Sequence, residues 1–251
     1  MIRVLDRAVS ILDCFTLDST HLTLKDISEK VALSTSTTSR LLNSLLALQI
    51  IKKDKKNKSY YLGPKLYHYG FLAKDNISAV KYAYPLMKQI RDKTKEAVTL
   101  YVLENDYRVC YEHVESLLFM SCVVRVGDRF PLWAGAGGKC ILAYSDEAYA
   151  LREIAKAYPI TGATITDRDS FLQELTAIRK DGYALSHGER EEGVISVAVP
   201  IFEPPHRIFG CLSVAAPTVR FDEQSMRELI PELKDTCSRI SMNLGIWEQA
   251  K

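Results

Sequence analysis

Residues 34–40 (STSTTSR) form a polar run whose side chains are suited to binding another molecule. Hydroxyl and β-branched residues are indifferent helix formers, so their concentration at the start of a leucine-patterned segment needs a cause other than helix propensity. DNA binding supplies one, because a recognition helix enters the major groove by its N-terminal end, where hydroxyls reach phosphates and an arginine can bind guanine. A Ser/Thr-rich turn facing water explains the same residues about as well.

A lysine-rich hairpin follows this run and favours DNA binding over a solvent-facing turn. A strand begins at Ile50 and Ile51, residues 54–58 form a turn, and residues 59–62 return to a stop at Gly63. Lysines crowd this hairpin, as in a winged protein that lays its wing along the phosphate backbone. Helix and hairpin together therefore favour a DNA-binding surface. The residues expected to contact DNA are Thr35, Ser36, Thr37, Thr38, Arg40, Lys55, Lys56 and Lys58.

Three helices are expected to hold this surface in place. Thr23, with Asp26 three residues later, predicts the start of one helix, and Ser34 is a candidate N-cap for the next. An earlier helix at about residues 4–17 completes a three-helix core. The apolar side chains expected in these helices are Val4, Leu5, Ala8, Ile11, Leu12, Phe15, Leu24, Ile27, Val31, Leu41, Leu42, Leu45 and Leu48.

Positive charge is concentrated in the first third of the chain. The net charge of the 251 residues is only +2, but residues 1–77 contain 12 Lys/Arg against 7 Asp/Glu, and the remainder contains 21 against 24. Anion-binding character is therefore confined to the N-terminal part. The sequence contains no recognisable signal peptide and no apolar run long enough to cross a bilayer, so we expect a cytoplasmic protein without a membrane partner.

Cysteine and histidine spacing indicates neither a disulfide framework nor a metal site. The six cysteines contain no CxxC pair and several fall within apolar runs, which favours reduced, buried thiols. The five histidines show no HxH or HxxxH spacing. We therefore expect no metal and no other cofactor.

The rest of the chain predicts a linker helix and an α+β domain. Pro64 is placed as the first residue of a helix at residues 64–77, although a fourth helix packed on the first domain fits the same pattern. A new domain begins at residue 78, and its mixture of helices and mostly antiparallel strands defines the α+β class. Strands are expected at residues 98–103, 108–114, 119–126, 183–186, 194–202 and 209–215, with helices at 78–95, 141–143, 147–157, 170–181 and 222–247.

A glycine-rich stretch at residues 131–140 (PLWAGAGGKC) is the most suggestive part of this second domain. Small residues let backbone approach a ligand closely, and the amides of a following helix N-terminus can hold a carboxylate. A P-loop needs glycine at the position of Trp133 and Ser or Thr at that of Cys140, so nucleotide binding is excluded. Taken alone, the glycines are explained more simply by a tight strand-to-helix turn.

Two other classes of function compete with a DNA-binding regulator. Cys140 at a helix start raises the alternative of a thiol hydrolase, because a helix N-terminus favours a thiolate. No histidine or acidic residue forms a recognisable partner motif, and an enzyme leaves the basic hairpin unexplained, so we expect no enzyme. The second alternative is a ligand-sensing module that dimerises without binding DNA.

Separated motifs in a fixed order resemble the IclR family of bacterial transcriptional regulators over essentially the whole chain. The resemblance implies a winged helix-turn-helix domain at residues 1–63, a linker helix at 64–77 and a GAF-like effector-binding domain at 78–251. It further implies homodimers or homotetramers that bind double-stranded operator DNA and sense a small carboxylate-bearing or aromatic metabolite. The motifs are residues 3–15 (RVLDRAVSILDCF), 33–45 (LSTSTTSRLLNSL), 61–63 (YLG), 131–143 (PLWAGAGGKCILA), 181–183, 192–200 and 212–217.

The resemblance also implies an effector pocket. The backbone amides of Ala136 and Gly137 are expected to meet a ligand carboxylate. Ser186 stands where many relatives have an acidic residue, and Ala215 where some have a hydroxyl, so the pocket is less polar than theirs. We therefore expect a carboxylate ligand with an apolar or aromatic body, which changes operator affinity through the linker helix. The residues expected at the effector are Ala136, Gly137, Ser186, Val194, Ser196, Ser213 and Ala215.

Overall fold

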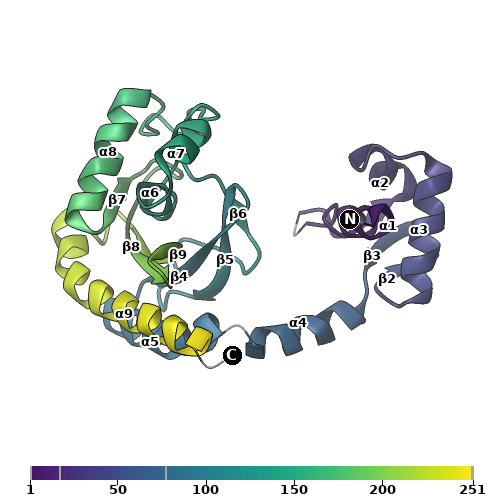
Figure 1. Ribbon diagram of the computed structural model, residues 1–251, viewed down its shortest axis with the longest axis horizontal. Helices are drawn as coiled ribbons and strands as arrows, with labels where there is room; N and C mark the ends of the chain where they lie inside the picture. The colour runs from purple at the N-terminus through teal and green to yellow at the C-terminus, as the bar shows by residue number, and fades with distance from the viewer. Residues whose placement is uncertain (1, 17, 77, 250–251) are drawn as a thin grey trace. The chain divides into compact units, whose positions relative to one another are not determined.

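The computed structural model describes residues 2–16, 18–76 and 78–249. The chain divides into two compact units, Met1–Asn76 and Ile77–Lys251. Figure 1 shows the small first unit and the larger second unit, in which helices surround a sheet.

The first unit consists of short helices and a three-stranded antiparallel sheet. The order of the strands in the sheet is β1-β3-β2, so the returning strand of the predicted hairpin lies in the middle. The elements are α1 (Arg3–Leu12), β1 (Leu22–Thr23), α2 (Leu24–Lys30), α3 (Thr35–Ala47), β2 (Ile51–Lys53), β3 (Ser59–Leu62) and α4 (Pro64–Asn76).

Both predicted helix starts are confirmed. Thr23 Oγ1 accepts the Asp26 N–H at 3.3 Å, while Asp26 Oδ2 accepts the Thr23 N–H at 2.8 Å, which completes a capping box. Ser34 Oγ accepts the Thr37 N–H at 3.3 Å and so caps α3. These caps fix where α2 and α3 begin. The core beneath them contains Ile11, Cys14, Leu22, Ile27, Leu42, Leu45, Ile51 and Tyr60.

The predicted core is wrong at both of its ends. Val4 and Leu5 of α1 are 58% and 62% exposed, because only the C-terminal half of that helix packs on the core through Ile11 and its neighbours. Leu48, one residue beyond α3, is 53% exposed. The hydrophobic pattern therefore extends past the part of each helix that other elements cover.

The second unit is a six-stranded antiparallel sheet with helices on both faces. The strand order is β6-β5-β4-β9-β8-β7, which brings β4 next to β9 in the centre. The elements are α5 (Ser78–Thr94), β4 (Ala97–Glu104), β5 (Tyr107–Val114), β6 (Arg129–Phe130), α6 (Ala136–Ala143), α7 (Glu147–Ile154), α8 (Arg168–Asp181), β7 (Ala184–His187), β8 (Val194–Glu203), β9 (Arg207–Pro217) and α9 (Glu223–Gln249).

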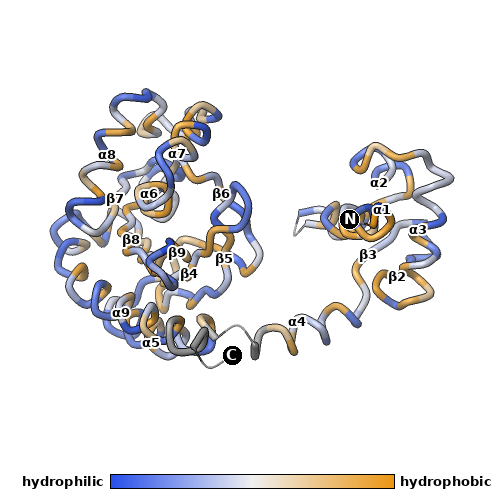
Figure 2. The backbone as a smooth tube through the Cα atoms, in the orientation of Figure 1, coloured by the Kyte–Doolittle hydropathy of each residue, from blue (hydrophilic) through white to orange (hydrophobic). Residues whose placement is uncertain are grey.

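Each face of this sheet has its own apolar core. Helices α5 and α9 cover one face, where Met87, Leu100 and Leu233 are buried together. Helices α6, α7 and α8 cover the other face, which buries Tyr101 and Phe171 with nearly all of α6. Burial on both faces explains why β4 and β8 are buried along most of their length and rich in apolar residues. Figure 2 shows hydrophobic (orange) segments between the two layers of helices in this unit.

The strand predicted at residues 119–126 is wrong. The backbone of Cys110, at the edge of β5, already pairs with a turn: its N–H donates to Asp128 O at 2.9 Å and its carbonyl accepts the Gly127 N–H at 2.8 Å. The apolar alternation survives, since Cys122 and Val124 are buried, but residues 119–126 form no strand. The strand that does form is β6, which pairs only with Arg108 and Val109. The other elements predicted in this unit are confirmed to within a few residues, except that α6 extends well beyond the short helix expected at residues 141–143.

Candidate nucleic-acid interface and ligand cavity

The first turns of α3 carry most of the predicted DNA-contacting residues. Thr35, Ser36 and Arg40 are exposed and Thr37 is half-buried. Ser34 Oγ donates to Thr37 Oγ1 at 2.9 Å and lies 3.1 Å from Ser36 Oγ, so the hydroxyls at the helix start form one linked group. Because the amides of a helix N-terminus attract anions, this group is placed where phosphate oxygens can be bound.

Thr38 differs from its neighbours. Its side chain is fully buried, and Oγ1 donates to Ser34 O at 3.0 Å. A side chain with no exposed surface is unable to touch DNA. We therefore correct the sequence-based expectation and leave Thr38 out of the DNA-contacting set.

The β2–β3 hairpin presents lysines on a fixed turn. Asp54 Oδ1 accepts the N–H of Lys56 at 2.8 Å, which holds the turn in one conformation. Lys55, Lys56 and Lys58 are all exposed. In the part of the chain that the structure describes, none of these three lysines forms an ion pair. Their charges are therefore uncompensated and available to a polyanion.

In the second unit, a small cavity brings together side chains from three adjacent strands. Ser186 on β7 faces Ser196 on β8, which in turn faces Ala215 on β9. The cavity volume is about 30 Å³, room for about two water molecules. Five of the residues predicted for the effector line it, namely Ser186, Val194, Ser196, Ser213 and Ala215, together with Tyr101, Arg108, Gly135, Glu189, Arg190 and Glu191.

The serines of this cavity differ in the partners they have. Ser213 Oγ donates to Val197 O at 3.1 Å. The hydroxyls of Ser186 and Ser196 have no hydrogen-bond partner among the described residues. These two hydroxyls are therefore the ones that a bound ligand can engage.

The first turn of α6 lies beside the cavity, but Ala136 and Gly137 do not line it. Both residues are fully buried inside α6. The N-cap, Gly135, does line the cavity, and its φ of +80° is a conformation that favours glycine. Ala136 and Gly137, the two residues predicted to meet the ligand carboxylate, therefore lie just after the residue that lines the cavity.

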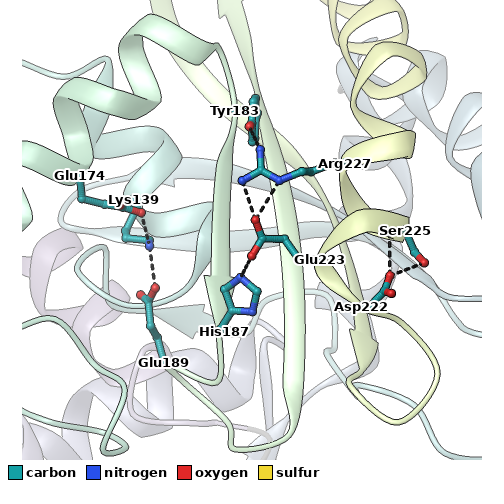
Figure 3. A network of polar contacts seen from close by, with 9 residues as sticks. All are labelled: Lys139, Glu174, Tyr183, His187, Glu189, Asp222, Glu223, Ser225 and Arg227. Atoms are coloured by element: carbon teal, nitrogen blue, oxygen red, sulfur yellow. Dashed lines mark hydrogen bonds and ion pairs between the residues drawn. The ribbon is translucent and has the colours of Figure 1, made fainter.

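A carboxylate of the protein itself occupies the N-terminus of α6. Glu189 Oε2 accepts the Gly135 N–H at 3.0 Å, and Glu189 Oε1 lies 2.6 Å from Lys139 Nζ. Lys139, only 1% exposed, also pairs with Glu174 of α8 at 2.7 Å, as Figure 3 shows. Glu189 therefore lies at the helix N-terminus on the Gly135 amide, one residue before the amides expected to meet a ligand carboxylate.

Arg108 on β5 lines the same cavity and was not among the residues expected from the sequence. Its side chain is buried, being 3% exposed, and its Nε has no hydrogen-bond partner. Its guanidinium carbon lies 5.0 Å from the ring centroid of Tyr101 and 5.4 Å from that of Phe130. Burial lowers the pKa of the Arg108 guanidinium. The sequence did contain a signal for a buried cation, because Arg108 precedes the apolar Cys110 by two residues and so shares its face of the strand.

Two larger hollows lie toward the other end of β8 and β9. One, of about 660 Å³, is lined by Phe202, Pro205 and Met242 among others, and one of about 720 Å³ lies beside Tyr149 and Arg207. Among the described residues, neither lining contains a buried side-chain polar atom without a partner. The smaller cavity is therefore the better candidate for a specific polar ligand.

The environment of Cys140 does not support a thiol hydrolase. The side chain is fully buried, and burial raises the pKa of its thiol well above the ordinary value. A nucleophilic thiol needs the opposite shift and an exposed sulfur. Among the described residues, no group of His, Cys, Asp and Glu is arranged to hold a metal, and no helix is long and apolar enough to span a membrane.

Two family models match the chain along most of its length. The IclR helix-turn-helix domain matches residues 4–55, and the C-terminal domain of the bacterial transcriptional regulator IclR matches residues 71–242. The HTH-type transcriptional regulator XynR of Escherichia coli (strain K12) is 32% identical to this chain over 247 residues, covering 98% of each protein.

Solved structures share the fold of both units. An IclR transcriptional regulator from Alicyclobacillus acidocaldarius has a TM-score of 0.89 at 26% identity, covering 98% of this chain and 100% of that one. An IclR homolog from Microbacterium hydrocarbonoxydans, complexed with 4-hydroxybenzoate, has a TM-score of 0.82 at 24% identity, covering 96% and 98%. The chain therefore belongs to the IclR family and is a DNA-binding transcriptional regulator.

Proposed function

We propose that the protein binds operator DNA through the N-terminal turns of α3 and the β2–β3 wing, and that a small carboxylate in the second-unit cavity controls its operator affinity. The observation that carries this proposal is a pair of unsatisfied binding surfaces. The first unit exposes lysines without ion pairs, and the second unit surrounds a cavity with hydroxyls and a buried guanidinium that lack partners.

The DNA contacts divide into two kinds. Arg40, exposed on α3, reads bases, and Thr35, Ser36 and Thr37 contact phosphates or base edges at the helix N-terminus. Lys55, Lys56 and Lys58 hold the phosphate backbone without reading sequence. This division predicts separate effects on specificity and on total affinity.

A homodimer or homotetramer is the assembly that suits such a regulator, because two recognition helices read the two halves of a palindromic operator. Its support is the apolar surface of α1 and its N-cap Ile2, since Ile2, Val4, Leu5 and Val9 are each more than half exposed. An exposed apolar surface of this kind is typical of a protein interface.

The division of the chain into a DNA-binding domain (1–63), a linker helix (64–77) and an effector domain (78–251) is part of this proposal. Along α4, Tyr67, Phe71 and Leu72 are exposed, which fits a linker better than a helix packed on the first domain. Effector binding then favours one arrangement of the effector domains, and α4 transmits that difference to the recognition helices. With operator DNA as its partner, we place the protein in the cytoplasm and propose that it acts as a regulator and not as an enzyme.

The effector class follows from the cavity lining. Beside its charged and hydroxyl-bearing side chains, Val194, Ala215 and the ring of Tyr101 supply apolar surface. This favours a carboxylate with an apolar or aromatic body. The structural relative complexed with 4-hydroxybenzoate supports the same class.

A fluorescence-anisotropy titration tests the DNA-binding part of the proposal. The full-length protein is titrated against DNA upstream of its own gene and against a scrambled duplex, at two salt concentrations. We expect preferential binding to the upstream DNA that weakens as salt rises. Equal binding to both duplexes, with and without the carboxylate probes described below, would contradict it.

A further inference from the structure

We propose that Arg108 binds the effector's carboxylate, an inference that rests on the proposed effector cavity and names the residue that selects its ligand. Within the described part of the chain, the Arg108 side chain has ring contacts but neither an ion pair nor a hydrogen bond. A buried charge without a partner is costly, so such residues are normally paired. A ligand anion in the adjoining cavity supplies the missing partner.

The position of the guanidinium is fixed on three sides. The rings of Tyr101 and Phe130 flank it, and the first turn of α6 closes the third side. A Cβ at Gly137 would lie 2.8 Å from Arg108 Nη1, and one at Gly135 would lie 3.2 Å from Nη2. These glycines therefore make the space in which the guanidinium meets the helix N-terminus. A carboxylate bound there is held by the planar donor fork beside the positive end of α6.

The nearby carboxylates of the protein are already engaged. Burial lowers the pKa of Arg108 and the charge of Glu189 raises it, but the Glu189 carboxylate is bound to the Gly135 amide and to Lys139. Glu191 is more than half exposed and lies 3.9 Å from Arg190. Among the described residues, both carboxylates that line the cavity therefore already have partners, and we assign the carboxylate that pairs with Arg108 to the ligand. This moves the predicted ligand carboxylate from the Ala136 and Gly137 amides to Arg108.

The other residues that line the cavity indicate what the rest of the ligand looks like. From Arg108 the cavity leads to Ser186, Ser196 and Ala215, which offer two unpartnered hydroxyls and an apolar surface. Arg190 lies 4.4 Å from the Phe130 ring centroid and is partly exposed, so it adds a second positive charge toward solvent. The ligand class is a monocarboxylate with an apolar body that can carry a hydroxyl or carbonyl group for Ser186 or Ser196. Binding it requires the cavity to widen from its present 30 Å³.

The test compares each carboxylate with its neutral amide on the full-length protein. The probes are acetate, pyruvate, benzoate and 4-hydroxybenzoate, each beside the corresponding amide at equal ionic strength. Thermal shift identifies the carboxylate that stabilises the protein most, and calorimetry then gives its Kd. The variants are Arg108→Gln, Arg108→Lys and the matched control Arg152→Gln. Arg152 also stacks on a tyrosine, Tyr149, but its side chain is 59% exposed.

We expect a carboxylate, but not its amide, to stabilise the wild type. Arg108→Gln should weaken carboxylate binding by roughly thirtyfold or more and remove the preference over the amide. Arg108→Lys keeps the charge but loses the fork, so it should bind more weakly yet still prefer the carboxylate. Arg152→Gln should match the wild type. Ligand-free Arg108→Gln should melt no lower than the wild type, because it removes an unpaired buried charge, whereas a purely structural arginine would lower the melting temperature.

Several results would overturn the assignment. They are equal stabilisation of the wild type by an amide, no stabilisation by any of the carboxylates, or an unchanged carboxylate preference in Arg108→Gln. If Arg108→Gln does not fold, the assignment would be overturned by an Arg108→Lys variant that binds the carboxylate as tightly as the wild type. Operator binding by ligand-free Arg108→Gln, measured by anisotropy, separates the two levels. If the variant binds the operator normally but the ligand test fails, only the role of Arg108 is rejected. If the wild type does not bind the operator, with or without the carboxylate probes, the proposed function is rejected.

Discussion

The two units of this protein each present positive charge without a partner carboxylate, but in opposite environments. The lysines of the β2–β3 wing are exposed to water, whereas Arg108 in the second unit is almost completely buried. Exposed lysines cost little to keep and are screened by salt, so they suit an extended polyanion. A buried guanidinium is expensive to leave unpaired and accepts only an anion that fits its cavity. Burial therefore distinguishes the surface for a large ligand from the site for a small one.

The largest effect is expected from removing a buried cation that does have partners. Lys139→Met should destabilise the second unit by about 3–5 kcal/mol, because Glu189 and Glu174 are left without their counter-ion. Urea unfolding followed by tryptophan fluorescence measures this, since Trp133 and Trp247 both belong to that unit. The control is Lys93→Met, which breaks a largely exposed pair with Glu232 and should cost about 1 kcal/mol or less. Equal losses in the two variants would mean that burial does not set the energies.

Arg40→Ala should produce the largest change in DNA specificity. If Arg40 reads a base, its removal lowers the preference for the operator over a duplex changed at that position by roughly 5- to 150-fold. Competition anisotropy with the two duplexes measures the ratio. Arg207→Ala, an exposed arginine of the second unit, should leave it unchanged. Equal loss of affinity for every duplex would assign Arg40 to the phosphate backbone instead.

Wing variants test the other half of the division. Lys56→Ala should weaken binding to specific and scrambled DNA alike and should lower the slope of log affinity against log salt by about one. The measurement is anisotropy at four salt concentrations. A change confined to the operator would show that the wing reads sequence.

Thr38 and Ser36 provide the smallest and most local contrast. Thr38→Val removes a buried hydroxyl that donates to Ser34 O, so it should lower the stability of the first unit by about 1 kcal/mol and leave operator affinity unchanged. Ser36→Ala, at an exposed position, should leave the stability of the first unit unchanged and weaken operator binding. Thermal melting by circular dichroism and anisotropy at low temperature distinguish the two effects. Weaker operator binding by folded Thr38→Val would restore Thr38 to the DNA surface.

Local signals in the sequence predicted the first unit well. The capping pair of Thr23 and Asp26 and the cap at Ser34 depend on residues three positions apart, and both form as expected. The same reasoning placed Thr38 with its exposed neighbours, because a hydroxyl run does not show which member faces the core. The strand expected at residues 119–126 failed for a similar reason. Its alternation is real, but alternation alone does not form a strand, and the backbone of Cys110 on β5 pairs with Gly127 and Asp128, which follow this segment.

The proposed ligand site depends on contacts between residues far apart in sequence. The resemblance to relatives indicated Ser186, Ser196 and Ala215, and strand pairing does bring these residues side by side. The environment of Arg108 depends on Tyr101, Phe130 and α6, and no spacing rule connects these elements. Nor does the sequence show that Glu189 fills the helix N-terminus. Long-range packing thus decides which cation remains unpaired.

The central claim is that the cavity of the second unit controls DNA binding by the first. The most direct measurement is the operator Kd of the full-length protein with and without a saturating amount of the carboxylate that stabilises it most. The account predicts a change of roughly 5- to 150-fold, and an equal change in carboxylate affinity when operator DNA is present. An operator Kd that stays the same while the carboxylate is bound would contradict it.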